Sequence, residues 1–241
     1  MKPLFFVGLH CVAHTNEFSR CMISVNRLEG RRKPLDINDW ILDSGAFSRL
    51  DSGQGHMAVA DYAAQIRRWS QCGRLLAAVA QDYMCEPSIL AKTGLTVAEH
   101  QRLTVANYDA LLEQDVGAYV LPVLQGYRPA EYVSHLAQYG DRLKLGQWVG
   151  VGSVCRRNGR PELIAAILWP IKERRPDLRL HFFGIKYTTL AWPAVRALTY
   201  SCDSMAWSYA ARREGRNAND WREAAAYCQR IEQLPEQGGM L

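Results

Sequence analysis

Short apolar runs rich in β-forming residues alternate with amphipathic stretches of helical length along the whole chain, and no other feature constrains the fold as strongly. This alternation predicts βαβ units around a parallel sheet. The runs with the composition of strands cover residues 4–9, 40–43, 75–81, 118–125, 148–152, 178–184 and 201–206. The stretches expected to form helices cover residues 17–28, 59–72, 97–114, 130–139, 161–174, 190–199 and 220–234.

Two of the expected helices carry a local start signal. Thr96 and Glu99 have the spacing of a capping box, in which each side chain bonds the backbone N–H of the other residue. Pro161 suits the first turn of a helix, where its missing N–H has no partner to lose.

An open doubly wound sheet and a closed (β/α)8 barrel of the TIM type both fit this pattern. The chain has 241 residues, and eight units of about 30 residues would fill it, which favours the barrel. The count is one strand short, so either an irregular segment hides a strand or the barrel is incomplete. No linker rich in Pro, Gly or Ser divides the sequence, and residues 1–241 are expected to form one domain.

Composition indicates a compact protein with no membrane segment. Hydrophobic residues make up 48% and charged residues 22% of the chain, as in average globular proteins, and no apolar run approaches the roughly 18 residues of a membrane span. The seven cysteines form no CxxC pair, which favours a reducing cytoplasm over a disulfide framework.

Polar residues end most of the apolar runs, and in a barrel these ends share one rim, where the active site lies. A single aspartate in such a place is more often a turn or cap residue than a catalyst. The segment Gly150-Val151-Gly152 does not continue as GxGxxG, because Cys155 takes the place of the third glycine, so a dinucleotide site is not expected. The run ends are Asp43-Ser44-Gly45-Ala46-Phe47, Gln81-Asp82 continuing to Cys85-Glu86-Pro87, Leu124-Gln125-Gly126, Val149 to Ser153, His181 to Lys186, and Cys202-Asp203-Ser204.

Taken in order, these segments resemble the tRNA-guanine transglycosylase superfamily, whose signature runs DSGGF, an Asp before a Cys and a Pro, VQGG, a glycine-rich strand end and an aspartate-containing last strand. The residues of these motifs and the short length of the chain are most similar to those of the phage-type DpdA proteins, the DNA 7-deazaguanine transglycosylases. The resemblance spans most of the chain. It implies a TIM-type barrel that replaces guanine in DNA with a 7-deazaguanine, such as 7-cyano-7-deazaguanine, through a covalent aspartyl–sugar intermediate.

The resemblance also assigns expected roles. Asp203 would be the nucleophile at the sugar C1′, as a carboxylate is in retaining glycosidases, and Asp43 would carry the proton to the departing guanine and from the incoming base. Asp82 would accept hydrogen bonds from the purine N1–H and 2-amino group, while the Gln125 amide and backbone N–H groups near Gly150 to Gly152 would donate to O6. The substrate-binding residues expected on these grounds are Asp82, Gln125, Gly126, Gly150, Gly152, Ser44 and His181. For His181, the alternative of a strand histidine satisfied within the core has at least equal weight.

The sequence departs from the family pattern at two points. The tRNA enzymes have DxxD on the last strand with the second aspartate as nucleophile, whereas here Asp203 stands at the first position and Ala206 at the second. The family's CxCxxC zinc motif is missing, so no metal and no cofactor are expected. His10, Cys11, His14 and Cys21 are the one cluster with ligand-like side chains, but His10 or His14 is more simply expected to line the pocket or touch phosphate.

Basic loops favour a nucleic-acid partner. Lys and Arg outnumber Asp and Glu by 29 to 24, and the arginines Arg156, Arg157, Arg212 and Arg213 follow two of the expected strands on the proposed active face. Guanidinium groups match phosphate geometry, so these four are expected to contact DNA. A third basic run covers residues 31–33. Exposed Trp207 or Tyr209 could stack on a displaced base.

Base exchange on DNA is therefore the expected function, with DNA and a 7-deazaguanine base as the partners. The alternatives are a tRNA-guanine transglycosylase, a nucleic-acid N-glycosidase, a sugar-metabolising barrel enzyme and a non-catalytic nucleic-acid-binding barrel. The sequence leaves the oligomeric state open.

Overall fold

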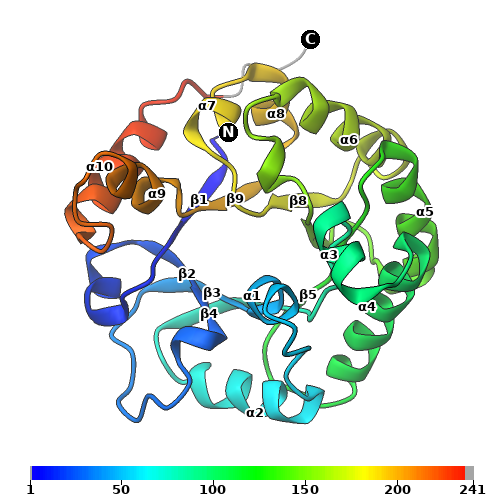
Figure 1. Ribbon diagram of the computed structural model, residues 1–241, viewed down its shortest axis with the longest axis horizontal. Coiled ribbons are helices and arrows are strands. Elements are labelled where there is room, and N and C mark those ends of the chain that lie inside the picture. The colour runs from blue at the N-terminus through cyan, green and yellow to red at the C-terminus, as the bar shows by residue number, and fades with distance from the viewer. Residues whose placement is uncertain (1, 237–241) are drawn as a thin grey trace.

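The computed structural model describes residues 2–236, which form a barrel of parallel strands surrounded by helices (Figure 1). The sheet order is β5-β4-β3-β2-β1-β9-β8-β7-β6, and every pair of neighbours is parallel. The strands are β1 (Leu4–Gly8), β2 (Arg20–Ser24), β3 (Asp39–Asp43), β4 (Arg74–Val79), β5 (Val120–Leu121), β6 (Val123–Leu124), β7 (Trp148–Val151), β8 (Arg179–Phe182) and β9 (Ser201–Ser204). The predicted TIM-type barrel is confirmed.

The two ends of the sheet, β5 and β6, are halves of one extended segment that Pro122 interrupts. Proline has no N–H for the ladder, but the neighbouring groups bridge the gap. The Ala80 N–H donates to the Leu121 carbonyl at 3.0 Å, and the Gly150 N–H donates to the Pro122 carbonyl at 2.8 Å. The barrel is thus nearly closed, with a single seam at Pro122.

Most of the helices lie outside the strands and follow them one by one (Figure 1). The helices are α1 (Ala46–Asp51), α2 (Val59–Trp69), α3 (Pro87–Thr93), α4 (Val97–Leu112), α5 (Pro129–Tyr139), α6 (Pro161–Arg174), α7 (Tyr187–Leu190), α8 (Pro193–Leu198), α9 (Ala206–Arg213) and α10 (Trp221–Glu232), with short 3-10 turns at Val12–Glu17, Val25–Arg27, Gly140–Arg142 and Cys155–Arg157. The capping box of Thr96 and Glu99 and the first-turn position of Pro161 are confirmed. None of the described helices is long and apolar enough to cross a membrane.

The helix expected over residues 17–28 is wrong, and the segment contains β2, the strand missing from the count. β2 lies between β1 and β3, and its central residues Cys21, Met22 and Ile23 are all buried. A parallel strand covered on both faces shows a continuous apolar run without alternation, which periodicity alone does not distinguish from a buried helix. The helix expected over 190–199 is likewise divided, because α8 begins at Pro193.

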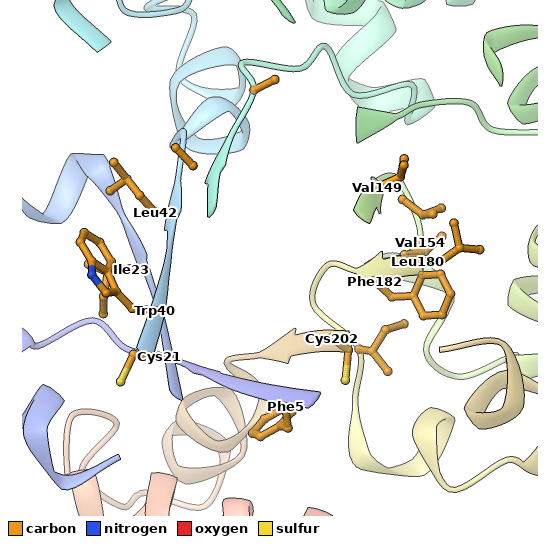
Figure 2. Close-up of a cluster of buried hydrophobic side chains, with 14 of the residues drawn as sticks. Phe5, Cys21, Ile23, Trp40, Leu42, Val149, Val154, Leu180, Phe182 and Cys202 are labelled. Carbon is orange, nitrogen blue, oxygen red and sulfur yellow. The ribbon is translucent and has the colours of Figure 1, made fainter. Parts of the chain in front are cut away.

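Alternating side chains of the strands fill two separate layers. One residue of each pair points outward to the helices, as Phe5, Trp40 and Leu42 do in the large cluster that Figure 2 shows. The next residue, such as Phe6 or Ile41, points into the barrel. The Phe6 ring lies 6.1 Å from that of Trp148 on β7, across the barrel from β1. The middle of the barrel is therefore packed with side chains.

Candidate active site

A cavity of about 570 Å³ opens at the carboxyl ends of the strands, and the aspartates Asp43, Asp82 and Asp203 all line it. Asp43 is the last residue of β3, Asp203 lies in β9, and Asp82 follows β4. Gln125, directly after β6, and Gly152, directly after β7, complete the same wall. The volume falls within the range of small-molecule sites, about 300–1,000 Å³.

Asp43 is held by local backbone at the end of β3. The Gly45 N–H donates to its Oδ2 at 3.1 Å. Gly45 has φ of +69°, and an added Cβ would lie 2.3 Å from the Asn26 side chain, so the sequence needs glycine there. Burial, and then the nearby charge of Asp203, raises the pKa of Asp43 to about 6, against the opposing effect of the hydrogen bond from Gly45. A carboxyl of this kind exchanges a proton near neutral pH.

Asp82 ends a hydrogen-bonded chain that crosses the cavity wall. Gln125 donates from Nε2 to Asp82 Oδ2, and its Oε1 accepts from the Ser153 hydroxyl at 2.8 Å. The Ser153 oxygen also lies 2.8 Å from Glu86 Oε2 and accepts from the Cys85 N–H at 2.9 Å. Burial raises the pKa of Asp82 to about 7, although the Gln125 hydrogen bond opposes the shift.

Asp203 is anchored through one of its two oxygens. Its Oδ1 accepts from the Gly184 N–H at 3.0 Å and lies 3.4 Å from His181 Nε2. Within residues 2–236, no hydrogen bond engages Oδ2. One carboxylate oxygen is therefore fixed, and the other is free for a ligand in the cavity.

His181 lies beneath Asp203 inside the barrel and does not line the cavity. It is fully buried, and its Nδ1 lies 3.0 Å from the Ser201 hydroxyl. The Trp148 indole N–H, which can only donate, bonds the same hydroxyl at 2.7 Å. When the Ser201 hydroxyl donates to Nδ1, the histidine proton is on Nε2, which faces Asp203 Oδ1 at 3.4 Å and has no hydrogen-bond partner among the described residues.

The glycines of the Val149 to Ser153 segment leave space for side chains of the protein. An added Cβ at Gly150 would lie 2.6 Å from the Phe183 ring, and one at Gly152 would lie 2.1 Å from Gln125 Nε2. Their N–H groups are taken by the sheet, because Gly150 donates to the Pro122 carbonyl and Gly152 to the Leu124 carbonyl. The expected donation from these two N–H groups to a purine O6 therefore does not fit the structure.

Two other predicted substrate-binding residues stand behind the cavity wall. Gly126 packs against Tyr132 of α5, whose backbone N lies 3.0 Å from an added Cβ. Ser44 is buried, and its hydroxyl has no partner among the described residues. Neither lines the cavity.

The predicted DNA-binding arginines follow two strands of the same rim: Arg156 and Arg157 lie in the 3-10 turn after β7, and Arg212 and Arg213 lie in the last turn of α9, after β9. Arg156 donates to the Ser88 hydroxyl at 2.9 Å and lies 5.9 Å from the ring of Phe47, which lines the cavity. Arg157 stacks over the Tyr127 ring at 4.3 Å. On the other side, Arg213 lies 6.0 Å from the Tyr209 ring. Burial is the main cause that lowers the pKa of His10, and the charges of Arg27 and Arg212 lower it further.

The structure also shows where the basic run at residues 31–33 and the aromatic residues Trp207 and Tyr209 lie. Arg31 is tied to the carbonyl groups of Lys33 and Pro34 within its own loop. Trp207 is buried and donates to the Gly8 carbonyl, whereas Tyr209 is 53% exposed. Only Tyr209 is therefore accessible to a base.

Several cavity residues were not expected from the sequence. Ser24 and Arg27 line the cavity because β2 ends beside β3. The sequence pattern predicts a helix over this segment and therefore does not place these two residues at the rim. Arg27 lies 3.0 Å from His10 Nδ1 and places a cation at the cavity mouth. Ser153 and Glu86 had no signal of their own, since they are brought together from segments 67 residues apart.

The four ligand-like residues near the first strand do not form a common site. His10 lines the cavity, His14 packs 5.8 Å from the Trp221 ring, Cys11 is exposed and Cys21 is buried in β2. Among residues 2–236, no group of three or more His, Cys, Asp or Glu side chains is arranged to hold a metal ion.

A parallel barrel with three carboxylates around a cavity at its carboxyl rim defines a barrel enzyme with an acidic active site. The particular family follows from the sequence profile of DpdA, "DeoxyPurine in DNA protein A", which matches residues 1–230. The chain belongs to the DpdA family, and this membership implies a transglycosylase with DNA as its substrate. Comparison with individually curated proteins gives no match.

The raised pKa of Asp82 predicts that Asp82→Asn stabilises the protein at high pH. The pKa of Asp82 is about 7 in the fold and about 3.9 in an unfolded chain. The folded state binds the extra proton between these values, so stability is lost as pH rises through that window. The variant should therefore melt higher than wild type at pH 8 and equally near pH 4. A gain of about 1 kcal/mol would raise Tm by about 2–4 °C.

Asp177→Asn provides a control of opposite sign for this measurement. Its hydrogen bond from Arg175 holds the pKa of Asp177 well below the usual range, so this variant should melt lower than wild type at pH 8. A lower Tm for Asp82→Asn at pH 8 would contradict the prediction.

Proposed function

We propose that the protein replaces guanine in DNA with a 7-deazaguanine, such as 7-cyano-7-deazaguanine, through a covalent aspartyl–sugar intermediate. The observation that carries this proposal is the presence of Asp43, Asp82 and Asp203 on one cavity in three different environments. Asp203 has a free oxygen, Asp43 has a pKa near neutrality, and Asp82 is bonded to an amide. These are the environments that a nucleophile, a proton carrier and a base-reading group require.

The first step breaks the bond between the sugar and guanine. Asp203 Oδ2 attacks C1′ from one side, as the C1′–N9 bond pair leaves with the base on the other. Protonated Asp43 gives its proton to the departing guanine and becomes a carboxylate. The sugar is then held as an ester of Asp203, and DNA remains attached to the protein.

The second step runs in reverse with a different base. The Asp43 carboxylate takes the N9 proton of the incoming deazaguanine, whose N9 attacks C1′. The ester bond breaks, Asp203 leaves as a carboxylate, and Asp43 is protonated again. One residue serves as acid and base in turn, as in retaining glycosidases.

The Asp82–Gln125 pair supports reading of a guanine edge. The free oxygen of Asp82 can accept from N1–H and the 2-amino group, and the second N–H of the Gln125 amide can donate to O6. The Ser153 hydroxyl holds Gln125 Oε1, which turns the amide donors toward Asp82 and the cavity. Guanine and 7-cyano-7-deazaguanine share this edge, so both fit the same site.

His181 is assigned a positioning role in place of the predicted substrate contact. With its proton on Nε2, the ring would support Asp203 Oδ1, which the Gly184 N–H already holds. Oδ2 is then the oxygen that faces the sugar. Because hydrogen bonds in free enzymes often tighten in the transition state, the 3.4 Å separation suits this role.

Base exchange is tested directly with purified protein, a guanine-containing oligonucleotide and 7-cyano-7-deazaguanine. Digestion and mass spectrometry of the nucleosides should show the deazaguanine nucleoside, and free guanine should appear in equal amount. Without the acceptor base, a DNA–protein adduct should survive denaturing electrophoresis. Asp203→Asn keeps the hydrogen bond to Gly184 but lacks the nucleophile, and it should form neither product nor adduct. Guanine release that leaves abasic DNA and needs no acceptor would instead indicate a glycosidase.

The pH dependence of adduct formation should be bell-shaped, with its maximum between pH of about 6 and about 7. The reactive form has Asp43 protonated, so that it can donate to the leaving base, and Asp82 ionised, so that it can accept from the purine. Because Asp82 has the higher pKa, this is the minor one of the two singly protonated forms, and its population falls below pH of about 6 and above pH of about 7. Single-turnover rates at constant ionic strength measure both limbs.

DNA carrying 7-methylguanine supplies the control for this profile. That base is already cationic and departs neutral without a proton from the enzyme. The alkaline limb should disappear with this substrate, and Asp43→Asn should release 7-methylguanine but not guanine. Equal release of guanine by Asp43→Asn and wild type would remove Asp43 from the mechanism.

Ser201→Ala should slow adduct formation while leaving the KM for DNA unchanged. Loss of the hydroxyl frees the histidine to place its proton on Nδ1, so Nε2 turns a lone pair toward Asp203. Removing the outer partner of a metal-bound histidine costs about 10–100-fold, and we expect a loss of kcat of that order. Ser208→Ala is the matched control, because Ser208 is equally buried and bonds the Ala218 carbonyl away from the cavity. Similar kcat values for both variants would contradict the positioning role of His181.

A further inference from the structure

A second cavity, of about 470 Å³, lies outside the barrel between α7, α9 and α10. It lies next to the catalytic cavity along the chain, since Met205 lines the first and the next residue, Ala206, lines the second. Likewise, Gly184 lines the first and Lys186 the second. Both loops follow strand ends of the same rim, so a polymer that enters the catalytic cavity passes beside this one.

Cations without acidic partners surround the second cavity. Lys186, Arg213 and Arg230 line it, and none of the three forms an ion pair within residues 2–236. Glu214 also lines the cavity, but its carboxylate is bonded to Arg216 at 2.6 Å, and Arg216 also pairs with Glu223. The cavity is therefore positively charged and open to an anion.

Tyrosine rings provide the other chemical element of this cavity. Lys186 lies 5.5 Å and Arg213 6.0 Å from the Tyr209 ring, near the outer limit of cation–π attraction. Arg230 lies 4.7 Å from the Tyr187 ring. Because their contacts with the Tyr209 ring are long, Lys186 and Arg213 can turn to a bound anion with little loss of cation–π attraction. The exposed face of the Tyr209 ring then remains for a flat partner.

From this combination we propose that the second cavity binds the phosphate and base of a nucleotide that neighbours the exchanged guanine in the DNA strand. Cations hold the phosphodiester, and the base stacks on Tyr209, as in sites for unpaired nucleic acid. The inference rests on the proposed function insofar as it takes DNA to be the polymer. It assigns Lys186, Tyr209 and Arg230 a role in holding the strand once the target base has left the stack.

The test measures the affinity of a fluorescein-labelled single-stranded oligonucleotide with one guanine by anisotropy over a range of salt concentrations. Each phosphate contact contributes about 0.7 to the salt slope for single strands, so Lys186→Ala with Arg230→Ala should reduce the slope by about 1.4. Tyr209→Ala should raise Kd about tenfold, within the range for loss of one stacked base. All three side chains are surface groups, and thermal melting confirms that the variants fold.

Arg179→Ala is the matched control. Arg179 lies over the Tyr200 ring at 5.4 Å, so its charge and aromatic neighbour are alike, but it begins β8 at the opposite end of the barrel. Its loss should leave Kd and the salt slope unchanged. Equal effects of Arg179→Ala and the Lys186 and Arg230 substitutions would show general charge attraction only and would overturn the site.

The position of the target guanine identifies the bound nucleotide. With guanine at the 5′ end or the 3′ end of the oligonucleotide, one of the two arrangements should lose all sensitivity to Tyr209→Ala, because the neighbour on that side is missing. A Tyr209 effect with free dGMP but not with either oligonucleotide would mean a mononucleotide site and would refute the inference. Exchange by wild type with no effect of these variants on DNA affinity would overturn only the second site. Weakened DNA affinity in the variants, without exchange by wild type, would overturn only the proposed reaction.

Discussion

Closure of a parallel barrel brings the carboxyl ends of distant strands onto one rim, and every feature of the cavity depends on this constraint. Asp43, Gln125 and Asp203 come from segments that are far apart in the sequence, yet all end on the same side because all strands run in the same direction. The closure itself depends on the short segment around Pro122. There the carbonyl groups of Leu121 and Pro122 accept hydrogen bonds from both neighbouring segments, which links the two sides of the seam although the proline has no N–H to donate.

Three carboxyl groups line one cavity, and each of them has different hydrogen-bond donors around it. Asp43 has the backbone N–H of Gly45, Asp82 has the Gln125 amide, and Asp203 has the Gly184 N–H with His181 beneath it. Burial raises the pKa of Asp43 and of Asp82 despite these donors. Different neighbours thus produce different protonation behaviour from one residue type, which a transglycosylase can use for separate roles.

Much of the fold was predictable because it follows local periodicity. The strands around Phe6, Trp40 and Leu180 and the long helices were found at or near their true positions, since apolar runs and caps are local signals. The strand β2 was not found, because burial on both faces removes the alternation that marks a strand. Because β2 was not predicted, Ser24 and Arg27 were not predicted as cavity residues either, since they reach the cavity only because β2 lies beside β3.

The sequence by itself indicated a parallel sheet of alternating strands and helices, favoured a barrel over an open sheet, and identified the acidic residues at the strand ends. Spacing and residue type are properties of the chain and carry this information directly. Only the tertiary structure decided how deep each side chain lies in the barrel and which neighbour it meets. His181 lies below Asp203, Phe183 fills the space at Gly150, and Glu86 contacts Ser153. These relations depend on how far each side chain stands along the barrel axis and on which neighbour from a distant segment fills the adjoining space, and no local pattern records either.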